Sequence, residues 1–342
     1  MLGLIIGRIY DNASPTLLKC GRDKRFSEIV EENTMEHAWV ANRPASEIPE
    51  TVSMPGAMVN ITNRCNLQCK HCFVFRDANP NVPVDEPTDD ELYDQLKTLR
   101  DKHGMRYMLW MGGEPMVRRK FLRRGLTLFQ RNTITTNGTI PLVNYSDVTD
   151  NLLYVVSLDG PEELNDAIRG KGVFSKVLDN ISKLPEDFPH VVQTQCVVTK
   201  RNVYALGEFV DIVRNTRFSH LSFSFHVPGA NDYGPDAWAD AEERDEAVRH
   251  IMRVKDESDG FVRNRTRALE MMLSENNPTQ VTDNCPSAKN LFPFYLEGKE
   301  LVTPFCCYGN DVDCDRCGAW VVFDLAARYE ADPEPVFGGL SR

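Results

Sequence analysis

Residues 65–72 read Cys65-Asn66-Leu67-Gln68-Cys69-Lys70-His71-Cys72, which spaces three cysteines as C-x3-C-x2-C shortly after the apolar run at 57–61. Cysteines this close strain the geometry of a disulfide, but their thiolates can converge on one soft metal centre. Three ligands for a four-iron cluster leave one iron open to another molecule. The spacing differs from the C-x2-C pairs of zinc ribbons. A partial zinc site and buried structural thiols are the alternatives.

An alternation of strands and helices surrounds this stretch. Strands are expected at 57–61, 106–111, 133–136, 152–158, 191–199 and 221–225, and helices at 88–103, 116–130, 173–184 and 203–213. Two further helices are expected after the last strand, at 238–255 and 261–274. Such alternation predicts parallel strands joined by right-handed crossovers. Six units are too few for a complete eight-fold barrel. The expected fold class is therefore α/β, a partial (β/α)6 barrel with an open side.

Several polar motifs follow the carboxyl ends of these expected strands. Gly112-Gly113-Glu114-Pro115 follows the second strand, Thr136-Asn137 the third, and Ser157 and Asp159 the fourth, with Arg169 shortly after. Ligands of open α/β sheets gather at this edge, so these residues are expected on one rim. Taken one at a time, the motifs also fit ordinary loops and strand-end caps, and Arg169 fits a surface ion pair.

A second group of cysteines surrounds a β-hairpin expected at 291–303. The group consists of Cys285, Cys306, Cys307, Cys314 and Cys317. Cys306 and Cys307 are neighbours, so only one of them is expected to join Cys285, Cys314 and Cys317 at a second metal centre. Four such cysteines fit structural zinc as readily as an iron–sulfur cluster.

The cysteine loop and the Gly112–Pro115 motif together resemble the radical S-adenosylmethionine (SAM) superfamily. The resemblance implies that Cys65, Cys69 and Cys72 hold a [4Fe-4S] cluster whose fourth iron binds SAM. It further implies a SAM site formed by His71, Gly112, Gly113, Glu114, Pro115, Thr136, Asn137, Ser157, Asp159 and Arg169. The later cysteines resemble the auxiliary-cluster extensions of SPASM and twitch type, which implies a second [4Fe-4S] cluster.

The resemblance also implies a reaction. Reductive cleavage of SAM yields a 5′-deoxyadenosyl radical, which abstracts hydrogen from a substrate, with electrons from a donor such as flavodoxin or ferredoxin. We expect a small-molecule biosynthetic intermediate, such as a sugar or nucleoside, because residues 1–53 are short for a peptide-recognition domain. Maturation of a ribosomally made peptide is the alternative. A non-catalytic zinc or iron–sulfur protein is the alternative from another class.

Composition sets further expectations. The net charge of −11 argues against a general nucleic-acid binder, which needs a basic surface. We find no signal peptide and no apolar run long enough to span a membrane, and clustered cysteines fit a reducing, cytoplasmic compartment. The expected organisation is an appendage at 1–53, the barrel at 54–228, a helical linker at 229–280, and the auxiliary-cluster extension with a tail at 281–342.

Overall fold

The structure is a computed structural model that describes residues 43–75 and 81–332. Most of the expected appendage and the tail after residue 332 lie outside these residues. In the described part the strands are β1 (Arg43–Pro44), β2 (Gly56–Asn60), β3 (Tyr107–Met111), β4 (Arg131–Thr136), β5 (Leu152–Ser157), β6 (Val191–Val198), β7 (Leu221–Phe225), β8 (Phe292–Glu297) and β9 (Glu300–Thr303).

The α-helices connect these strands and cover the outside of the sheet. They are α2 (Asp89–His103), α3 (Arg119–Gly125), α4 (Glu162–Arg169), α5 (Val173–Ser182), α6 (Leu206–Val213), α7 (Ala241–Asp256), α8 (Thr266–Glu270), α9 (Pro278–Asp283), α10 (Ser287–Asn290) and α11 (Trp320–Ala331). Short 3-10 turns are η4 (Ala45–Glu47), η5 (Pro115–Arg118), η6 (Leu126–Leu128), η7 (Val203–Ala205) and η8 (Ser274–Asn276).

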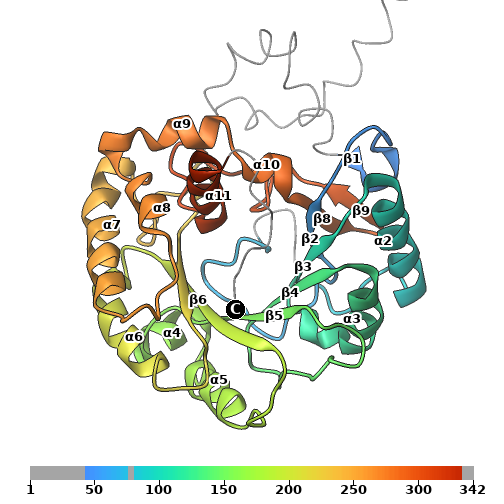
Figure 1. Cartoon of the computed structure of the whole chain (residues 1–342), viewed down its shortest axis with the longest axis horizontal. Helices are drawn as coiled ribbons and strands as arrows, with labels where there is room; N and C mark the ends of the chain where they lie inside the picture. Colours follow the sequence, from blue (N-terminus) through green and yellow to red (C-terminus); the bar gives the residue numbers. More distant parts are fainter. Residues whose placement is uncertain (1–42, 76–80, 333–342) are drawn as a thin grey trace, which may run out of the picture.

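The described strands form one curved sheet in the order β1-β9-β8-β2-β3-β4-β5-β6-β7. Strands β2 to β7 pair in parallel, as the alternating pattern predicts. Figure 1 shows the sheet curving around a central space, with helices outside it and α11 in the gap opposite the strands. The prediction of a partial α/β barrel is confirmed.

The C-terminal hairpin extends the barrel sheet, which the sequence did not indicate. Strand β8 pairs in parallel with β2, and β9 pairs antiparallel with both β8 and β1. The expected hairpin at 291–303 is confirmed, and it gives β2 its second neighbour. The extension that carries the later cysteines is therefore continuous with the barrel.

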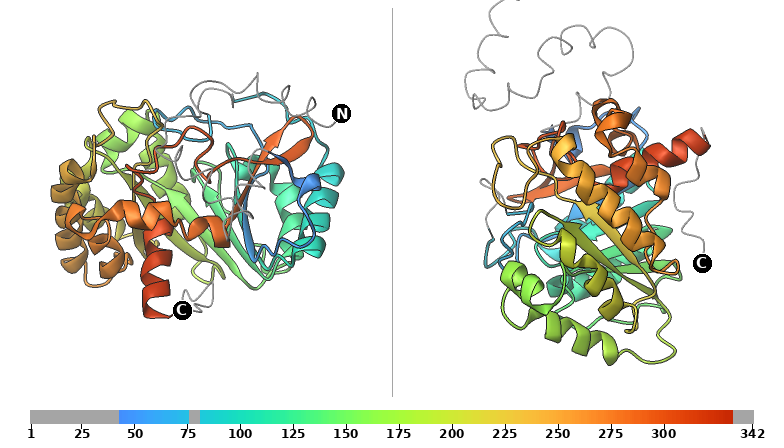
Figure 2. Two further views of the ribbon diagram at one scale, coloured as in Figure 1. Left: turned by 90° about the horizontal axis from the view of Figure 1, so that it is seen from above. Right: turned by 90° about the vertical axis from the view of Figure 1, so that its left-hand side faces the viewer.

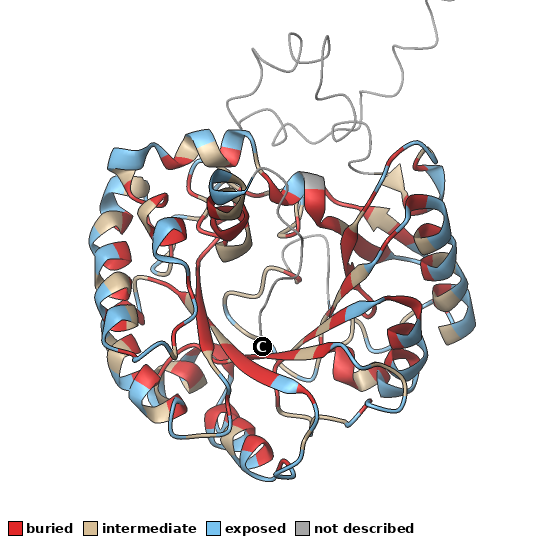
Figure 3. Ribbon diagram, viewed as in Figure 1, coloured by how far each residue is buried: buried red, intermediate tan, exposed pale blue. Residues whose placement is uncertain are grey.

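Apolar side chains fill the layer between sheet and helices. In Figure 3 the strands are largely buried, and the outer helices turn buried faces inward and exposed faces outward. Helix α2 shows how the sequence builds one such face: Leu92, Leu96 and Leu99 are buried, and Gly104 ends the helix with φ of 68°. A left-handed residue at this position favours glycine.

Two helix predictions were wrong, and one helix was missed. The expected helix at 116–130 is divided into η5, α3 and η6, and α3 ends at Gly125, which packs against the Trp110 ring. Helix α4 was not predicted at all. The expected helix at 261–274 is mostly absent, because Val262 forms a parallel bridge with Leu221 and Asn264 hydrogen-bonds the backbone of Phe223. Only α8 and η8 remain helical there.

The amino ends of the parallel strands lie at one end of the barrel, and their carboxyl ends lie at the other. The side views in Figure 2 show the loop after β2 at one end and α11 reaching towards the other. The expected site motifs therefore share one end, as their positions after strands predict. Within the described residues, no helix is long and apolar enough to cross a membrane.

Candidate active site

A large cavity fills the inside of the barrel and runs along its strands. Its volume is about 1770 Å³, above the roughly 300–1,000 Å³ of an ordinary small-ligand pocket. At the amino ends of the strands, Arg131, Val191 and His220 line it. At the carboxyl ends it is lined by most residues expected to bind a cluster or SAM, namely Cys65, Cys69, His71, Cys72, Gly112, Gly113, Thr136, Asn137, Ser157 and Arg169.

The loop after β2 turns three cysteines towards this cavity. Leu67 N donates to Cys65 Sγ at 3.4 Å, and Cys72 N donates to Cys69 O at 3.2 Å. Burial raises the pKa of the Cys65 thiol to about 12 and also raises that of Cys69. Cysteine thiolates are the usual ligands of iron–sulfur clusters. Three cysteines that line one cavity therefore fit such a cluster as a donor set.

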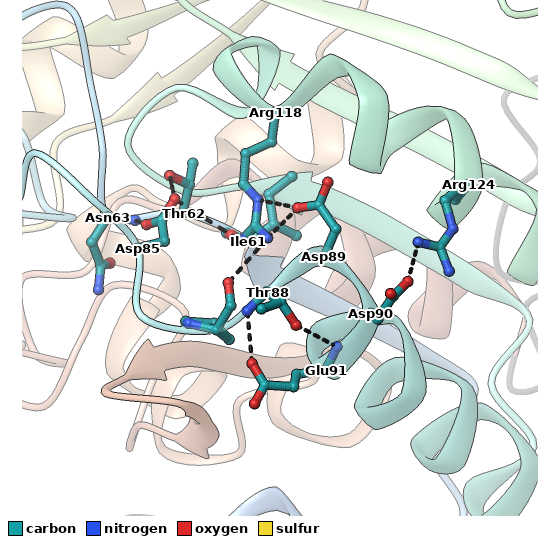
Figure 4. Close-up of polar contacts among 11 residues, drawn as sticks. Ile61, Thr62, Asn63, Asp85, Thr88, Asp89, Asp90, Glu91, Arg118 and Arg124 are labelled. Carbon is teal, nitrogen blue, oxygen red and sulfur yellow. Dashed lines mark hydrogen bonds and ion pairs between the residues drawn. The ribbon is translucent and has the colours of Figure 1, made fainter.

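Asp85 and Arg118 make a set of polar contacts, here called the polar brace, that holds the residues leading into the cysteine loop. Thr62 Oγ1 donates to Asp85 Oδ2 at 2.6 Å, and Asn63 N donates to Asp85 Oδ1 at 2.8 Å. Figure 4 shows these contacts beside the start of α2. Both oxygens of one carboxylate thus hold consecutive residues, which limits the movement of the loop that follows.

Arg118 is the second part of this brace. Its Nη1 donates to Ile61 O at 2.7 Å, and its Nη2 lies 2.5 Å from Asp89 Oδ1 (Figure 4). The arginine is buried, so these contacts form in a region of reduced dielectric, where they are stronger than in water. The N-cap of α2 supports Asp89, because Thr88 and Glu91 form a capping box.

Gly112 and Gly113 allow a close approach to the backbone that precedes the cysteine loop. A Cβ at Gly112, where φ is 144°, would lie 2.5 Å from Thr62 O, and one at Gly113 would lie 2.3 Å from Arg64 O. Gly113 N donates to Thr62 O at 2.8 Å. No other residue fits this backbone conformation and spacing together. The glycines therefore join the second expected motif to the first.

The carboxylate of Glu114 points into the protein. Oε1 accepts hydrogen bonds from Met116 N at 2.9 Å and Thr136 Oγ1 at 2.7 Å, and Oε2 accepts from Asn137 N at 2.7 Å. Asn137 in turn donates to Asn66 Oδ1 at 2.9 Å, within the cysteine loop. Through Asn137, Glu114 thus connects the end of β4 to the cysteine loop. Its predicted contact with SAM stays a prediction.

His71, Asp159 and Arg169 form one buried group. Asp159 Oδ2 lies 2.7 Å from Arg169 Nε and 3.2 Å from His71 Nε2, and its Oδ1 accepts from Val197 N at 3.0 Å. Burial opposes ionisation of Asp159, yet Arg169 and His71 hold the pKa of this carboxyl below its usual range. Asp159 therefore orients the two side chains that line the cavity.

His71 also offers an unused polar atom. Its Nδ1 is buried, and no hydrogen-bond partner for it lies among the described residues. A buried polar atom without a partner is costly, and a ligand in the cavity would satisfy this one. Ser157, at the end of β5, lines the same cavity, whereas Pro115 is buried at the start of η5.

The second cysteine set is assembled from three segments. Cys285 lies between α9 and α10, Cys306 and Cys307 follow β9, and Cys314 and Cys317 precede α11. Burial raises the pKa of Cys307 and of Cys317 to about 12, and in each case Cys285 raises it further. The thiols that the hairpin separates in sequence are thus electrostatic neighbours.

The two adjacent cysteines differ in their contacts. Cys307 lines the central cavity, and its thiol lies 3.7 Å from Leu291 O and 4.0 Å from Ser287 Oγ. Cys306 packs against the main core and also against the smaller cluster that contains Cys307. Burial raises the pKa of both thiols and Cys285 raises both further, so both lie near Cys285.

Tyr308 connects the two cysteine regions. Its ring lies 4.8 Å from that of Phe73, which follows Cys72 directly. Its phenol interacts with the Ser224 hydroxyl, and burial raises the pKa of the phenol well above its usual range. The residue after Cys307 thus contacts the residue after Cys72, with β7 as the third partner.

A polar wall lines the cavity on the side of β6 and β7. Gln193, Gln195, Ser222 and Ser224 line it there, and Trp320 joins them from α11. Ser222 is only 2% exposed, and no partner for its Oγ is found within the described residues. The Trp320 indole N–H is likewise buried without a described partner. These groups are neutral, so they match hydroxyl or amide groups of a ligand.

Comparison with known proteins assigns this barrel. Residues 59–211 match the Radical SAM superfamily, and this segment spans β2 to α6 with the cysteine loop and every strand-end motif. Residues 59–211 are a radical SAM domain. The radical SAM domain that the sequence predicts is confirmed, and its superfamily uses a [4Fe-4S] cluster and SAM.

Curated relatives of the radical SAM domain carry enzyme names. The chain is 29% identical over 181 residues to Fe-coproporphyrin III synthase of Methanosarcina barkeri, which covers 51% of this chain and 44% of that protein. It is 30% identical over 188 residues to mycofactocin maturase MftC of Mycobacterium tuberculosis, covering 53% and 46%. The matched part spans less than half the length of these relatives.

A solved structure shares the fold beyond the radical SAM domain. Streptococcus suis SuiB bound to the precursor peptide SuiA is similar with a TM-score of 0.57 and 14% identity, over 79% of this chain and 64% of that one. At this identity the likeness concerns the fold alone.

The sequence missed several residues that hold the radical SAM domain together. Asp85 and Arg118 lie in a proline-rich loop and a 3-10 turn, where no periodic pattern marks them. The link between His71, Asp159 and Arg169 joins a loop, a strand end and a helix that was not predicted. Cys196 is buried within β6.

Proposed function

We propose that the chain is a radical SAM enzyme whose reaction chamber is the barrel cavity. One observation carries the proposal: the three cysteines of the loop and the residues expected to hold SAM line the same end of one cavity. When bound, the cluster and SAM supply reductive cleavage of SAM and hydrogen-atom abstraction from a substrate. An external one-electron donor, such as flavodoxin or ferredoxin, is required.

The protein residues then bind, orient and exclude water. Gly112 and Gly113 present backbone at the cavity wall, Ser157 presents a hydroxyl, and His71 presents an unpartnered Nδ1. Asp159 fixes the Arg169 guanidinium, so this cation is placed before any ligand arrives. Because such a reaction is selective only through positioning, rigid placement of these groups is the contribution of the chain.

The polar wall supports a substrate rich in neutral hydrogen-bonding groups. Ser222 and Trp320 each hold an unused polar atom inside the cavity, and neither carries a charge. A sugar or nucleoside supplies hydroxyl and amide partners for them. A small-molecule intermediate of this kind is our first candidate substrate.

A ribosomally made peptide is the second candidate. The cavity of about 1770 Å³ reaches both ends of the strands, which suits an extended chain. A related protein is named a mycofactocin maturase, and the similar SuiB structure contains a precursor peptide. Peptide amides match the polar wall as well as hydroxyl groups do.

We further propose a second [4Fe-4S] cluster at the C-terminal cysteines. Cys285, Cys306, Cys314 and Cys317 are the proposed ligands, because Cys307 faces the central cavity and contacts Leu291 and Ser287 instead. The contact between Tyr308 and Phe73 places this second region beside the first. A role in holding substrate or accepting an electron from a product radical follows from that position.

Anaerobic reconstitution tests the proposal. We expect about eight irons per chain and, with dithionite and SAM, formation of 5′-deoxyadenosine. Replacing Cys65, Cys69 and Cys72 together by alanine should remove about four irons and all SAM cleavage. Cys196→Ala, which removes the cysteine of the described residues that belongs to neither set, is the control for iron content and should retain about eight irons. Two bound zinc ions without SAM cleavage would establish the non-catalytic alternative.

Substrate class is tested separately with the reconstituted chain. Saturation-transfer NMR with a panel of sugars, nucleosides and synthetic peptides should detect binding that Ser222→Val weakens. Binding of sugars or nucleosides with no peptide binding supports the first candidate. The reverse result supports peptide maturation.

A further inference from the structure

Arg244 is a buried arginine beside the C-terminal cysteines. It belongs to α7 and is only 2% exposed. Nη1 donates to Cys317 O at 2.8 Å and to Arg316 O at 3.3 Å, and Nη2 donates to Met272 O at 3.1 Å. Its Nε is buried without a hydrogen-bond partner in the described part of the chain. The guanidinium thus lies against the segment that ends in Cys317.

Arg244 has no carboxylate in direct contact. Within residues 43–75 and 81–332, no ion pair includes it. The adjacent Asp245 acts on its charge only through space, because the two oxygens of Asp245 accept hydrogen bonds from Ser274 N at 2.8 Å and Ser274 Oγ at 2.6 Å. The other buried arginines near the two sites differ, since Arg169 pairs with Asp159 and Arg316 with Asp313.

A lone buried guanidinium is unfavourable unless an anion faces it. Removal of such a charge from water costs several kcal/mol, which carbonyl hydrogen bonds offset only in part. The guanidinium lies beside a proposed ligand of the second cluster, because Nη1 donates to the carbonyl oxygen of Cys317. Gly318 permits this approach, because a Cβ there would lie 2.4 Å from Phe225 Cβ and 3.3 Å from Arg244 Nη1.

We propose that Arg244 is a positioning residue that balances the negative charge of an iron–sulfur cluster bound by Cys285, Cys306, Cys314 and Cys317, and thereby raises its reduction potential. The inference rests on the proposed second cluster. A [4Fe-4S] cluster with four thiolates is an anion, and reduction adds one more negative charge. A fixed cation nearby stabilises the reduced form more than the oxidised form.

The test measures a potential rather than activity. Cys65, Cys69 and Cys72 are replaced by alanine in the full chain, so that only the second cluster is loaded, and the midpoint potential is determined by EPR-monitored titration. Arg244→Gln removes the charge and keeps a donor for Cys317 O. We expect the oxidised form to gain about tenfold over the reduced form, a fall of about 59 mV for a one-electron couple.

Two further variants separate charge from structure. Arg244→Lys keeps the charge and loses most carbonyl contacts. The midpoint potential of the second cluster in this variant should therefore stay near that of the chain with Arg244. Arg249→Gln removes an exposed charge from the same helix, and its potential should not change. If Arg244→Gln loses the cluster while Arg244→Lys keeps it, the need for charge is also supported.

Two results overturn the inference and remain distinct from failure of the proposed function. Equal midpoint potentials of the second cluster in the Arg244→Gln chain and in the chain with Arg244, with four irons bound in each, exclude a charge effect. Equal behaviour of the Gln and Lys variants, whether a shift or loss of the cluster, assigns Arg244 a structural role. If the chain with Arg244 intact binds no iron at the second set, the proposed second cluster itself is wrong.

Discussion

The two cysteine regions are built in opposite ways. The first set occupies eight consecutive residues, and a polar brace and a glycine pair hold its loop from outside. The second set comes from three segments that meet only when β8 and β9 join the sheet. Their cations differ as well, since Arg169 pairs with Asp159, whereas Arg244 forms no ion pair among the residues that the structure describes. A contiguous loop suits a site that exchanges ligands, and a set gathered from separate segments suits a site that stays closed.

The largest expected effect separates the two regions by function. Cys69→Ala should remove about four irons and lower SAM cleavage at least about 100-fold, because each ligand of the first set is required. Cys317→Ala should also remove about four irons but leave SAM cleavage measurable. Iron analysis and chromatography of 5′-deoxyadenosine check both. Loss of SAM cleavage in both variants would contradict the division of roles.

A second prediction concerns the balanced cation of the first region. Asp159→Asn leaves Arg169 buried without its partner, which should cost about 3–5 kcal/mol of unfolding free energy. Urea unfolding of the cluster-free chain measures it. Asp179→Asn, which breaks an exposed pair with Lys183, is the matched control and should change stability by under about 0.5 kcal/mol. Equal losses of unfolding free energy in the two variants would show that burial does not strengthen the contribution of the pair between Asp159 and Arg169.

The third prediction concerns the brace. Arg118→Met leaves Ile61 O and Asp89 without their donor and should destabilise the chain by about 1–3 kcal/mol. It should also speed iron loss from the first set only, measured by chelator challenge. Arg124→Met, which removes an exposed contact to Asp90 (Figure 4), should have neither effect. Faster loss from both sets would show that the brace supports the whole barrel.

The smallest effect lies outside both regions. Burial lowers the pKa of His220 to about 4, so the folded state holds this imidazole neutral where the unfolded chain would protonate it. Stability from this group is present above about pH 6.5 and is lost as the pH falls towards 4. With partial exposure we expect under about 1 kcal/mol. Over this pH range the melting temperature of His220→Gln should depend less on pH than that of the unmodified chain, equally with and without iron. A pH dependence of the melting temperature that changes with iron would link His220 to a cluster.

The sequence predicted what is local and periodic. Strand positions followed from apolar runs, and the first cysteine set followed from spacing within one loop. The gathering of motifs on one rim followed from the parallel topology. These features need only neighbouring residues or the order of strands, so one sequence suffices for them.

The remainder depends on contacts between distant segments. Pairing of β8 with β2, the link from Asp159 to His71, and the position of Arg244 beside Cys317 each join residues far apart in the chain. Glu114 is another such residue: its predicted contact with SAM stays a prediction, and the sequence did not show that its carboxylate hydrogen-bonds Thr136 and Asn137. Sequence identifies such residues as polar but does not show which way they turn.

The pairing of β8 with β2 has a consequence for synthesis of the chain. Strand β2 emerges early from the ribosome, but its second neighbour appears only about 230 residues later. Until then, the apolar edge at Ala57, Met58 and Val59 stays open to other strands. Domains of this kind form slowly because the closing contact is so distant in sequence. The nascent barrel therefore needs protection from aggregation until its last strands are made.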